Sequence, residues 1–283
     1  MFEIKTYKLN RAEAKQDSQS NGWLLKWNFK DAGKWVWVKT PGFMFNWNGE
    51  SYAEVIASAV AKDLKIHKFV TYRPCIVELD NTNILCCISD EFLRHDSEFD
   101  ISFAKLMEQG ILDSMYTYYF VDGHKKFIND CLRILDIDMS EQLDEIIVFD
   151  SLILNRDRTF RNFGIIANNY GGPVRKAPIF DSGSSFGLDM YFVTSEFCEE
   201  EKYSFGYHAK PFDSEYEKQL KLVKNFDKYR GVQLVHTYKT LEFIANNFSD
   251  KSNIYNVVNP IPMETIRYIK EILRAGISRL NKV

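Results

Sequence analysis

Three polar residues in the middle of the chain have the types and the spacing needed to bind a divalent metal ion and to accept a proton. Asp157 and Asn162 lie five positions apart in a polar loop. Asp181 comes directly after a short apolar stretch and is the first residue of the sequence Asp-Ser-Gly. One charged and one neutral oxygen ligand suit Mg²⁺, which keeps several waters and binds nucleotide phosphates. We therefore expect Asn162 and Asp181 to bind the metal ion and Asp157 to act as a general base.

A β-hairpin is expected to bring the two metal ligands together. Apolar residues on either side of a turn at Gly171 and Gly172 predict two antiparallel strands, of which the first covers 163–167. If the hairpin is centred between the two glycines, Asn162 lies directly opposite Asp181. Directly opposed residues in an antiparallel pair have Cα atoms about 4.5–5.5 Å apart. The two oxygen ligands should therefore converge at the open end of the hairpin.

The order of these features matches the catalytic core of protein kinases. In that core, an Asp-x4-Asn loop supplies the base and one metal ligand, and an Asp-x-Gly after a hairpin supplies the second metal ligand. Asp-x4-Asn alone is a weak signal, because chance matches are frequent. The alternative is that Asp157 and Asn162 cap the loop and Asp181 forms a turn. A helix, a loop, a hairpin and Asp-Ser-Gly in this order favour the catalytic interpretation.

A phosphate-binding lysine and its carboxylate partner are also predicted. Kinases hold the α- and β-phosphates with a lysine on a small-lobe strand, and this lysine pairs with a helix glutamate. Residues 35–39 alternate as a strand that ends at Lys39, and Glu54 lies in a helix expected from Ser51 onward. We expect Lys39 and Glu54 to form this pair. The alternatives are a solvated strand end for Lys39 and a capping box between Ser51 and Glu54.

Two further segments are expected to contact the nucleotide. Ser20 and Asn21 lie in a polar loop whose backbone amides would cradle phosphate, although a solvated surface loop fits the sequence equally well. Residues 86–89 are expected to join the two lobes. Cys87 and Ser89 would then contact adenine through the backbone of this linker.

The composition argues against several classes of protein. The chain has 283 residues, a net charge of −3 and no basic stripe, unlike a dedicated nucleic-acid-binding protein. Its apolar runs are far shorter than the roughly 20 residues that span a bilayer. The five cysteines lack the CxxC spacing of structural zinc sites, and their odd number argues against a disulfide framework. A soluble, cytoplasmic protein is expected.

The chain is predicted to have an α+β, bilobal, protein-kinase-like fold. Residues 1–90 favour strands around one helix and predict a small β-rich N-lobe that holds the nucleotide. Residues 91–283 favour helices and predict a larger, mainly helical C-lobe that carries the catalytic loop and the metal-binding hairpin. In this C-lobe, apolar residues at helical spacing predict helices over 140–154, 213–226 and 266–280.

Two segments carry a resemblance to a known family: Asn155-x-Asp157-Arg158-x-x-x-Asn162-Phe163-Gly164 and Pro178-Ile179-Phe180-Asp181-Ser182-Gly183-Ser184. They resemble the HipA-like serine/threonine kinases, most closely the short members that lack HipA's extra N-terminal subdomain, such as HipT and CtkA. The signature of that family usually reads N-x-D-R-H-x-x-N. This chain has Thr159 in place of the histidine.

The resemblance implies a function and a set of partners. Asp157 would be the catalytic base, Asn162 and Asp181 would bind Mg²⁺, and ATP would be the phosphoryl donor. The acceptor would be a Ser or Thr of a protein, including Ser18 or Ser20 of the chain's own nucleotide loop. A HipB-like antitoxin or regulator is an expected partner, whereas a membrane and direct contact with nucleic acid are not.

Besides a nucleic-acid-associated regulator that would act through a small DNA-binding partner, as the resemblance to the HipA toxin systems implies, two other functions stay open on the sequence. Phosphoinositide kinases resemble this loop too, so a lipid or small-molecule kinase is one alternative, against which the lack of a basic membrane-facing cluster argues. A catalytically dead kinase-fold module is the other, and Thr159, Trp37 and the glycine-poor loop at 17–22 support it. Trp37 shares the face of Lys39 on the expected strand and should border the adenine pocket, where kinases usually have a smaller residue.

Overall fold

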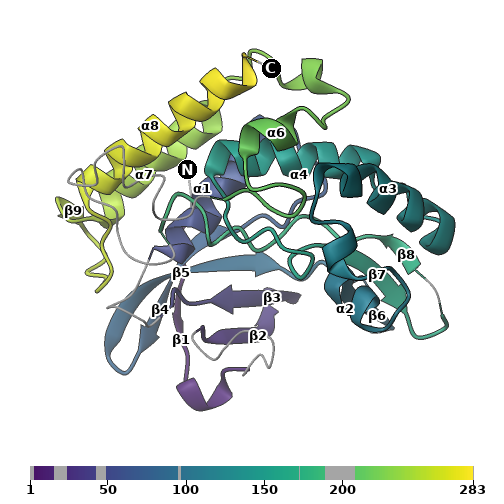
Figure 1. Cartoon of the computed structure of the whole chain (residues 1–283). Coiled ribbons are helices and arrows are strands. Elements are labelled where there is room, and N and C mark those ends of the chain that lie inside the picture. The colour runs from purple at the N-terminus through teal and green to yellow at the C-terminus, as the bar shows by residue number, and fades with distance from the viewer. Residues whose placement is uncertain are drawn as a thin grey trace.

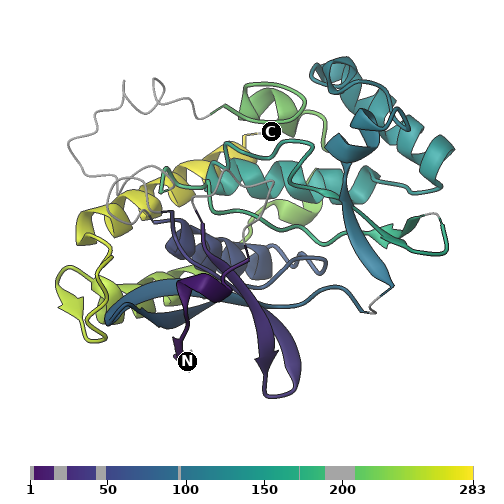
Figure 2. The same ribbon diagram turned by 90° about the horizontal axis from the view of Figure 1, so that it is seen from below.

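The computed structural model describes residues 3–15, 24–42, 49–94, 97–171, 173–188 and 208–282. These residues form a five-stranded sheet at the N-terminal side, a three-stranded sheet and a group of helices that fills most of the remaining volume (Figure 1, Figure 2). Of the helices in these ranges, none combines the length and the apolar character that a bilayer span requires.

The five-stranded sheet has the strand order β1-β4-β5-β3-β2. Neighbouring strands are antiparallel except for β1 and β4, which are parallel. The strand expected over 35–39 is confirmed as β3. The five strands are β1 (Thr6–Lys8), β2 (Lys26–Asp31), β3 (Lys34–Lys39), β4 (Arg73–Leu79) and β5 (Thr82–Asp90).

β3 divides its side chains between the two faces of this sheet. Val36 and Val38 are buried in an apolar cluster on one face. Because side chains alternate along a strand, Trp37 and Lys39 lie on the opposite face. That opposite face is the one that borders the rest of the chain.

The helix α1 (Glu50–Asp63) packs on the face of the sheet that carries Lys39. It contacts β4 and β5 on one side and α7 (Val235–Phe248) on the other, so it is buried along most of its length. Burial of a charged residue in such a helix is costly unless that residue has a partner. Glu54 lies in the buried part of α1 and has Lys39 as its partner.

The second part of the chain is mainly helical. α8 packs along α4 and also contacts α7, and Figure 1 shows α7 and α8 side by side at the edge of the molecule. α4 and α8 confirm the helices expected over 140–154 and 266–280. The α-helices are α2 (Phe103–Glu108), α3 (Val121–Leu135), α4 (Ser140–Ile153), α6 (Tyr216–Leu220), α7 and α8 (Met263–Leu280). The 3₁₀ helices are η1 (Arg11–Glu13), η2 (Met115–Thr117) and η3 (Phe226–Tyr229), and the strands are β6 (Glu98–Ser102), β7 (Gly164–Asn168), β8 (Pro173–Lys176) and β9 (Ser252–Asn253).

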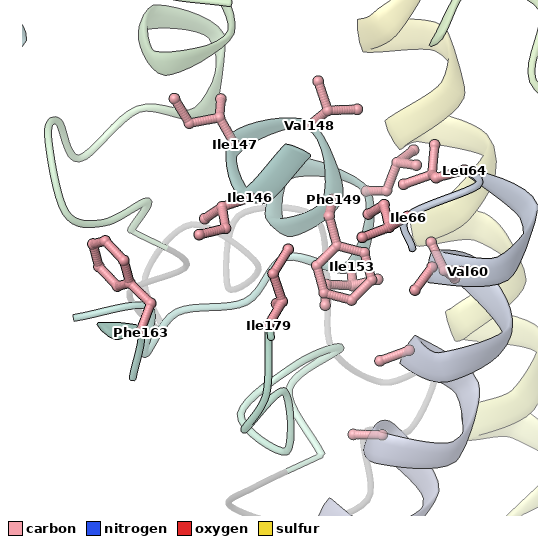
Figure 3. Packing of buried hydrophobic residues seen from close by; sticks show 14 of the residues in the cluster. Val60, Leu64, Ile66, Ile146, Ile147, Val148, Phe149, Ile153, Phe163 and Ile179 are labelled. Carbon is pink, nitrogen blue, oxygen red and sulfur yellow. The ribbon is translucent and has the colours of Figure 1, made fainter. Parts of the chain in front are cut away.

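α4 anchors the two segments that carry the predicted metal ligands. Figure 3 shows the apolar side chains of α4 packed with Phe163 and Ile179. Both side chains are buried. Phe163 directly follows Asn162, and Ile179 lies two residues before Asp181. The core therefore fixes the backbone next to each predicted ligand.

The helix expected over 213–226 is only partly present, because α6 ends at Leu220. Beyond it, the backbone amides of Lys224 and Asn225 donate to Asp144 Oδ2 at 3.1 and 3.3 Å. An α-helix would need these amides to donate to carbonyl groups four residues earlier. The side chain of Asp144 on α4 therefore diverts them, and η3 follows instead of a continued α-helix.

Gly164→Ala is expected to destabilise the protein by about 2–3 kcal/mol. Residue 164 begins β7 beside β6, and an added Cβ would lie 2.1 Å from the backbone oxygen of Ile101, which cannot move without its strand. Urea unfolding measures the loss. Gly231→Ala is the control, because an added Cβ there has nothing within 4 Å and the variant costs only the strain of a left-handed residue, about 1 kcal/mol. Equal losses in the two variants would contradict the packing argument.

Candidate active site

A pocket of about 1050 Å³ lies between the five-stranded sheet and the second part of the chain. Six residues that were expected at the site from the sequence line it: Trp37, Lys39, Ser89, Asp157, Asn162 and Asp181. Pockets for small molecules typically measure about 300–1,000 Å³. This one is therefore large enough for a nucleotide together with part of a second substrate.

The Lys39 ammonium lies between two carboxylates. Its Nζ is 3.0 Å from Glu54 Oε1 and 2.5 Å from Asp181 Oδ1. Burial by itself lowers the pKa of Lys39, but the charges of Asp181 and Glu54 outweigh burial and raise this pKa well above its ordinary value. The Lys39 charge in turn lowers the pKa of Asp181 to about 2. At neutral pH, the pocket therefore contains a fixed cation next to a fixed anion.

Glu54 connects β3 to the segment of Asp181. It is fully buried, and while Oε1 binds Lys39, Oε2 accepts a hydrogen bond from the backbone amide of Ser182 at 3.0 Å. The N-cap of α1 is Gly49, and no side chain caps this helix end. The capping-box alternative for Glu54 is therefore wrong. The Lys39–Glu54 pair expected from the sequence is present.

Asp157 and Asn162 are joined by hydrogen bonds within one loop. Asn162 Nδ2 donates to the backbone oxygen of Asp157 at 2.5 Å and to Asp157 Oδ2 at 3.0 Å. The Asp157 amide donates to Asn155 Oδ1 at 3.1 Å. These bonds fix the loop while the Asp157 side chain stays 51 % exposed. A hydroxyl group of a second substrate can therefore reach the carboxylate.

A lysine that no sequence pattern indicated lies beside this carboxylate. Lys210 Nζ is 3.7 Å from Asp157 Oδ1, and the lysine side chain is 40 % exposed. Lys210 is 53 positions further along the chain than Asp157, so local spacing carries no signal for it. The site thus has a second cation close to the predicted base.

Arg158 is the residue that brings the two predicted metal-ligand segments together. Its Nη1 donates to the backbone oxygen of Asn162 at 2.9 Å and to that of Phe180 at 2.5 Å. Its Nε and Nη2 bind the carboxylate of Asp150 at 2.9 and 3.2 Å. Both side chains of this ion pair are almost completely buried. Arg158 is part of the segment that resembles the HipA-like kinases. Asp150 was not predicted as its partner, because it lies among the regularly spaced apolar residues of α4.

The hairpin register expected from the sequence is wrong. Ile165 pairs with Lys176, and continuing this register to Asn162 would reach Ile179 rather than Asp181. One cause is an irregularity between Ile166 and Ala167, which shifts the pairing.

A second cause is that the ladder ends before it reaches the predicted ligands. The backbone of Ile179 pairs instead with the segment at Phe69, exchanging hydrogen bonds with Lys68 and Val70. Asp181 itself has a φ of 56°, a left-handed conformation that ends any strand. The two ligand segments meet through the Arg158 guanidinium rather than through a β-ladder.

The arrangement of lobes, pocket and charged residues can be compared with known proteins. No family model matches the chain, and no curated protein matches it by sequence. The crystal structure of the proinflammatory kinase CtkA from Helicobacter pylori matches with a TM-score of 0.61 and 14% identity, over 98% of each chain. The chain has a protein-kinase-like fold. The sequence-based resemblance to HipA-like kinases is thereby confirmed at the level of the fold.

Two other kinase structures match less closely. HipA of Shewanella oneidensis MR-1, in a complex with HipB and operator DNA, matches with a TM-score of 0.45 and 9% identity, over 94% of this chain and 66% of HipA. The Golgi casein kinase matches with a TM-score of 0.44 and 14% identity, over 99% of this chain and 72% of that kinase.

The linker between the lobes of this kinase-like fold was expected at the wrong residues. Cys87 lies inside β5, between Lys39 of β3 and Pro74 of β4, so its backbone is part of the sheet. Ser89 also belongs to β5, where it pairs with Trp37, although it lines the pocket. β5 continues to Asp90 because β3 pairs with it that far.

The remaining nucleotide-loop residues lie outside the part of the chain that the structure describes. This applies to Ser20 and Asn21, which were expected to bind phosphate, and to Ser18 as an expected acceptor. Their predicted roles stay predictions. Leu24 is the first residue in sequence order that lines the pocket among the described residues.

The donor set fits a divalent ion that is shared with phosphates. Among the described residues, no three His, Cys, Asp or Glu side chains are grouped to hold a metal ion by themselves. Asn162 and Asp181 offer one amide oxygen and one carboxylate, which are the hard oxygen donors that Mg²⁺ prefers. Mg²⁺ is commonly bound through one or two protein oxygens plus substrate phosphates. The two residues thus fit a metal ion that binds together with a nucleotide.

Asp150→Asn is expected to destabilise the kinase-like domain by about 3–5 kcal/mol, because it leaves the buried Arg158 without a counter-charge. It should also lower any activity of the pocket, since Arg158 holds the carbonyl groups of Asn162 and Phe180. Chemical unfolding measures the stability. Asp90→Asn is the control, because its ion pair with Arg73 is exposed and such pairs contribute little. Similar losses in both variants would refute the structural role of the buried pair.

Proposed function

We propose that this protein is an ATP- and Mg²⁺-dependent kinase that transfers phosphate to Ser or Thr hydroxyl groups of a protein. The observation that carries the proposal is the common pocket of Lys39, Asp157, Asn162 and Asp181, with Lys39 bound to both Glu54 and Asp181. We keep 1–90 as the N-lobe and 91–283 as the C-lobe, with the pocket between them.

In the proposed reaction, each of these pocket residues has a separate role. Lys39, held in place by Glu54, binds the α- and β-phosphates. Asn162 and Asp181 bind Mg²⁺, which when bound neutralises the charge of the phosphate oxygens. The Asp157 carboxylate accepts the proton of the attacking hydroxyl group. In such sites, catalysis depends mainly on positioning and on charge neutralisation.

The acceptor side of the pocket supports a large substrate. The Asp157 side chain is half-exposed, so a Ser or Thr of another protein can approach it without entering a closed cavity. A HipB-like regulator, expected from the resemblance, stays a prediction. So does a cytoplasmic location.

Incubation with γ-labelled ATP and Mg²⁺, followed by mapping of phosphorylated residues on the protein itself and on added casein, tests the proposal. Wild type is expected to incorporate label at Ser or Thr, and EDTA or Asp181→Ala should remove the incorporation. Label in an added lipid and in no protein would favour a lipid kinase. Absence of label and of ATP binding in the wild type would identify a catalytically dead module and overturn the proposal.

A further inference from the structure

The end of the pocket away from the phosphates is formed by a tryptophan and a glutamate in contact. Trp37 and Lys39 lie on the same face of β3, about 7 Å apart along the strand. The indole Nε1 of Trp37 donates to Glu91 Oε2 at 2.6 Å. Glu91 directly follows β5 and lines the pocket. A nucleotide that binds Lys39 with its phosphates would have room for its base beside Trp37 and Glu91.

After β5, the backbone amides of Glu91, Leu93 and Arg94 donate hydrogen bonds to other groups of the protein. The Glu91 amide donates to the oxygen of Trp35 at 3.0 Å, and the Leu93 amide donates to Glu91 Oε1 at 3.1 Å. The Arg94 amide donates to Glu98 Oε2 at 2.7 Å. At these three residues, a base that needs a backbone donor must therefore compete with these bonds.

Beside Trp37, the described residues offer a base the carboxylate of Glu91 as a hydrogen-bond acceptor. A carboxylate accepts hydrogen bonds and donates none, and each of its oxygens has two lone pairs. Each Glu91 oxygen accepts one hydrogen bond from the protein, which leaves capacity for a second.

The chemistry of the purine edges can be matched to this set of acceptors. Guanine carries two adjacent donors, N1–H and the N2 amino group, which one carboxylate can accept together. Adenine carries one amino donor, at N6, next to the acceptor N1, which needs a donor from the protein. Hydrogen bonds to a charged acceptor are stronger than those between neutral groups. The Trp37 ring, over which Lys15 Nζ lies at 4.8 Å from the ring centroid, adds an aromatic surface that suits either base.

We propose that Glu91 reads the purine base of the phosphoryl donor and that the pocket accepts GTP as well as ATP. This inference rests on the proposed function, because it assumes that Lys39 and Asp181 hold the phosphates. It goes beyond that function by assigning a specificity-determining residue and a second donor substrate.

Calorimetric titrations of MgATP and MgGTP into wild type, Glu91→Gln and Asp100→Asn test the inference. Wild type is expected to bind the two nucleotides with dissociation constants within about tenfold of each other. Glu91→Gln is expected to weaken GTP relative to ATP by about tenfold or more, since it removes a charged acceptor. Asp100→Asn removes a carboxylate from the same pocket and should leave the ratio unchanged.

The outcomes separate this inference from the function on which it rests. If wild type binds ATP more than tenfold tighter than GTP, or if Glu91→Gln leaves the ratio unchanged, the inference is wrong and the kinase proposal stands. If the wild type binds neither nucleotide, the kinase proposal fails and the inference fails with it. An equal change of the ratio in Asp100→Asn would mean that total charge, and not Glu91, selects the base.

Discussion

Asp157→Asn is expected to lower the rate of phosphoryl transfer by about 10²–10⁴-fold, which is the usual contribution of a general base. The amide cannot take up the proton of the attacking hydroxyl group. It can still accept the hydrogen bond from Asn162 Nδ2, so the loop should keep its shape. Single-turnover transfer from γ-labelled ATP measures the rate, and calorimetry measures nucleotide affinity, which should stay close to that of the wild type.

Two controls sharpen this experiment. Asp227→Asn changes an exposed carboxylate at the start of η3 and should have wild-type activity. Lys210→Met removes the cation near Asp157 and leaves the carboxylate itself in place. Full activity of Asp157→Asn would remove Asp157 from the mechanism. A parallel loss of nucleotide binding would show that the variant disturbs the whole pocket.

Lys39→Met is expected to abolish transfer and to cost about 3–5 kcal/mol of stability, as is typical when one partner of a buried ion pair is removed. The reason is Glu54, which is fully buried and would lose its counter-charge. In the double variant Lys39→Met/Glu54→Gln, the neutral amide needs no counter-charge and can still accept from the Ser182 amide. Most of the stability should therefore return while activity stays lost.

Urea unfolding and the labelled-ATP assay together test this pair of variants. Lys62→Met, on the exposed side of α1, is the matched control for the loss of a lysine and should resemble wild type in both. Recovery of stability without activity separates the structural role of the ion pair from phosphate binding. An active Lys39→Met variant, or a double variant as unstable as the single one, would contradict the account.

The parts of the site that depend on local sequence could be predicted. The strand that ends at Lys39 is visible from its alternation, and the helix that carries Glu54 is visible from its start and its apolar residues. Their contact follows once the helix packs on the sheet. Asp157 and Asn162 lie on one short loop, so their proximity needed no long-range information.

The parts that depend on long-range packing could not be predicted. The meeting of the Asn162 and Asp181 segments depends on Arg158, and the buried position of Arg158 depends on Asp150 of α4. Asp150 occupies a core-facing position among apolar residues, so its spacing indicates a helix face rather than an ion pair. Lys210 reaches the site from a distant segment, as tertiary contacts do without any periodic signal.

The irregular hairpin has the same explanation. A symmetric turn was the simplest prediction, but register also depends on which other segment the second strand can pair with. Ile179 pairs with the segment at Phe69, and its side chain enters the core beside α4. Core packing of Ile179 and the left-handed conformation of Asp181 therefore override the ladder.

In the proposed mechanism, Asn162 and Asp181 hold a divalent ion jointly with nucleotide phosphates. Titration of Mn²⁺, followed by electron paramagnetic resonance with and without ATP, tests it most directly. We expect weak Mn²⁺ binding to the protein alone and tight binding, beyond that of Mn²⁺ to ATP alone, when protein and ATP are both present. Both Asn162→Ala and Asp181→Ala should lose this additional binding. Mn²⁺ binding that does not depend on ATP, or that survives both substitutions, would contradict it.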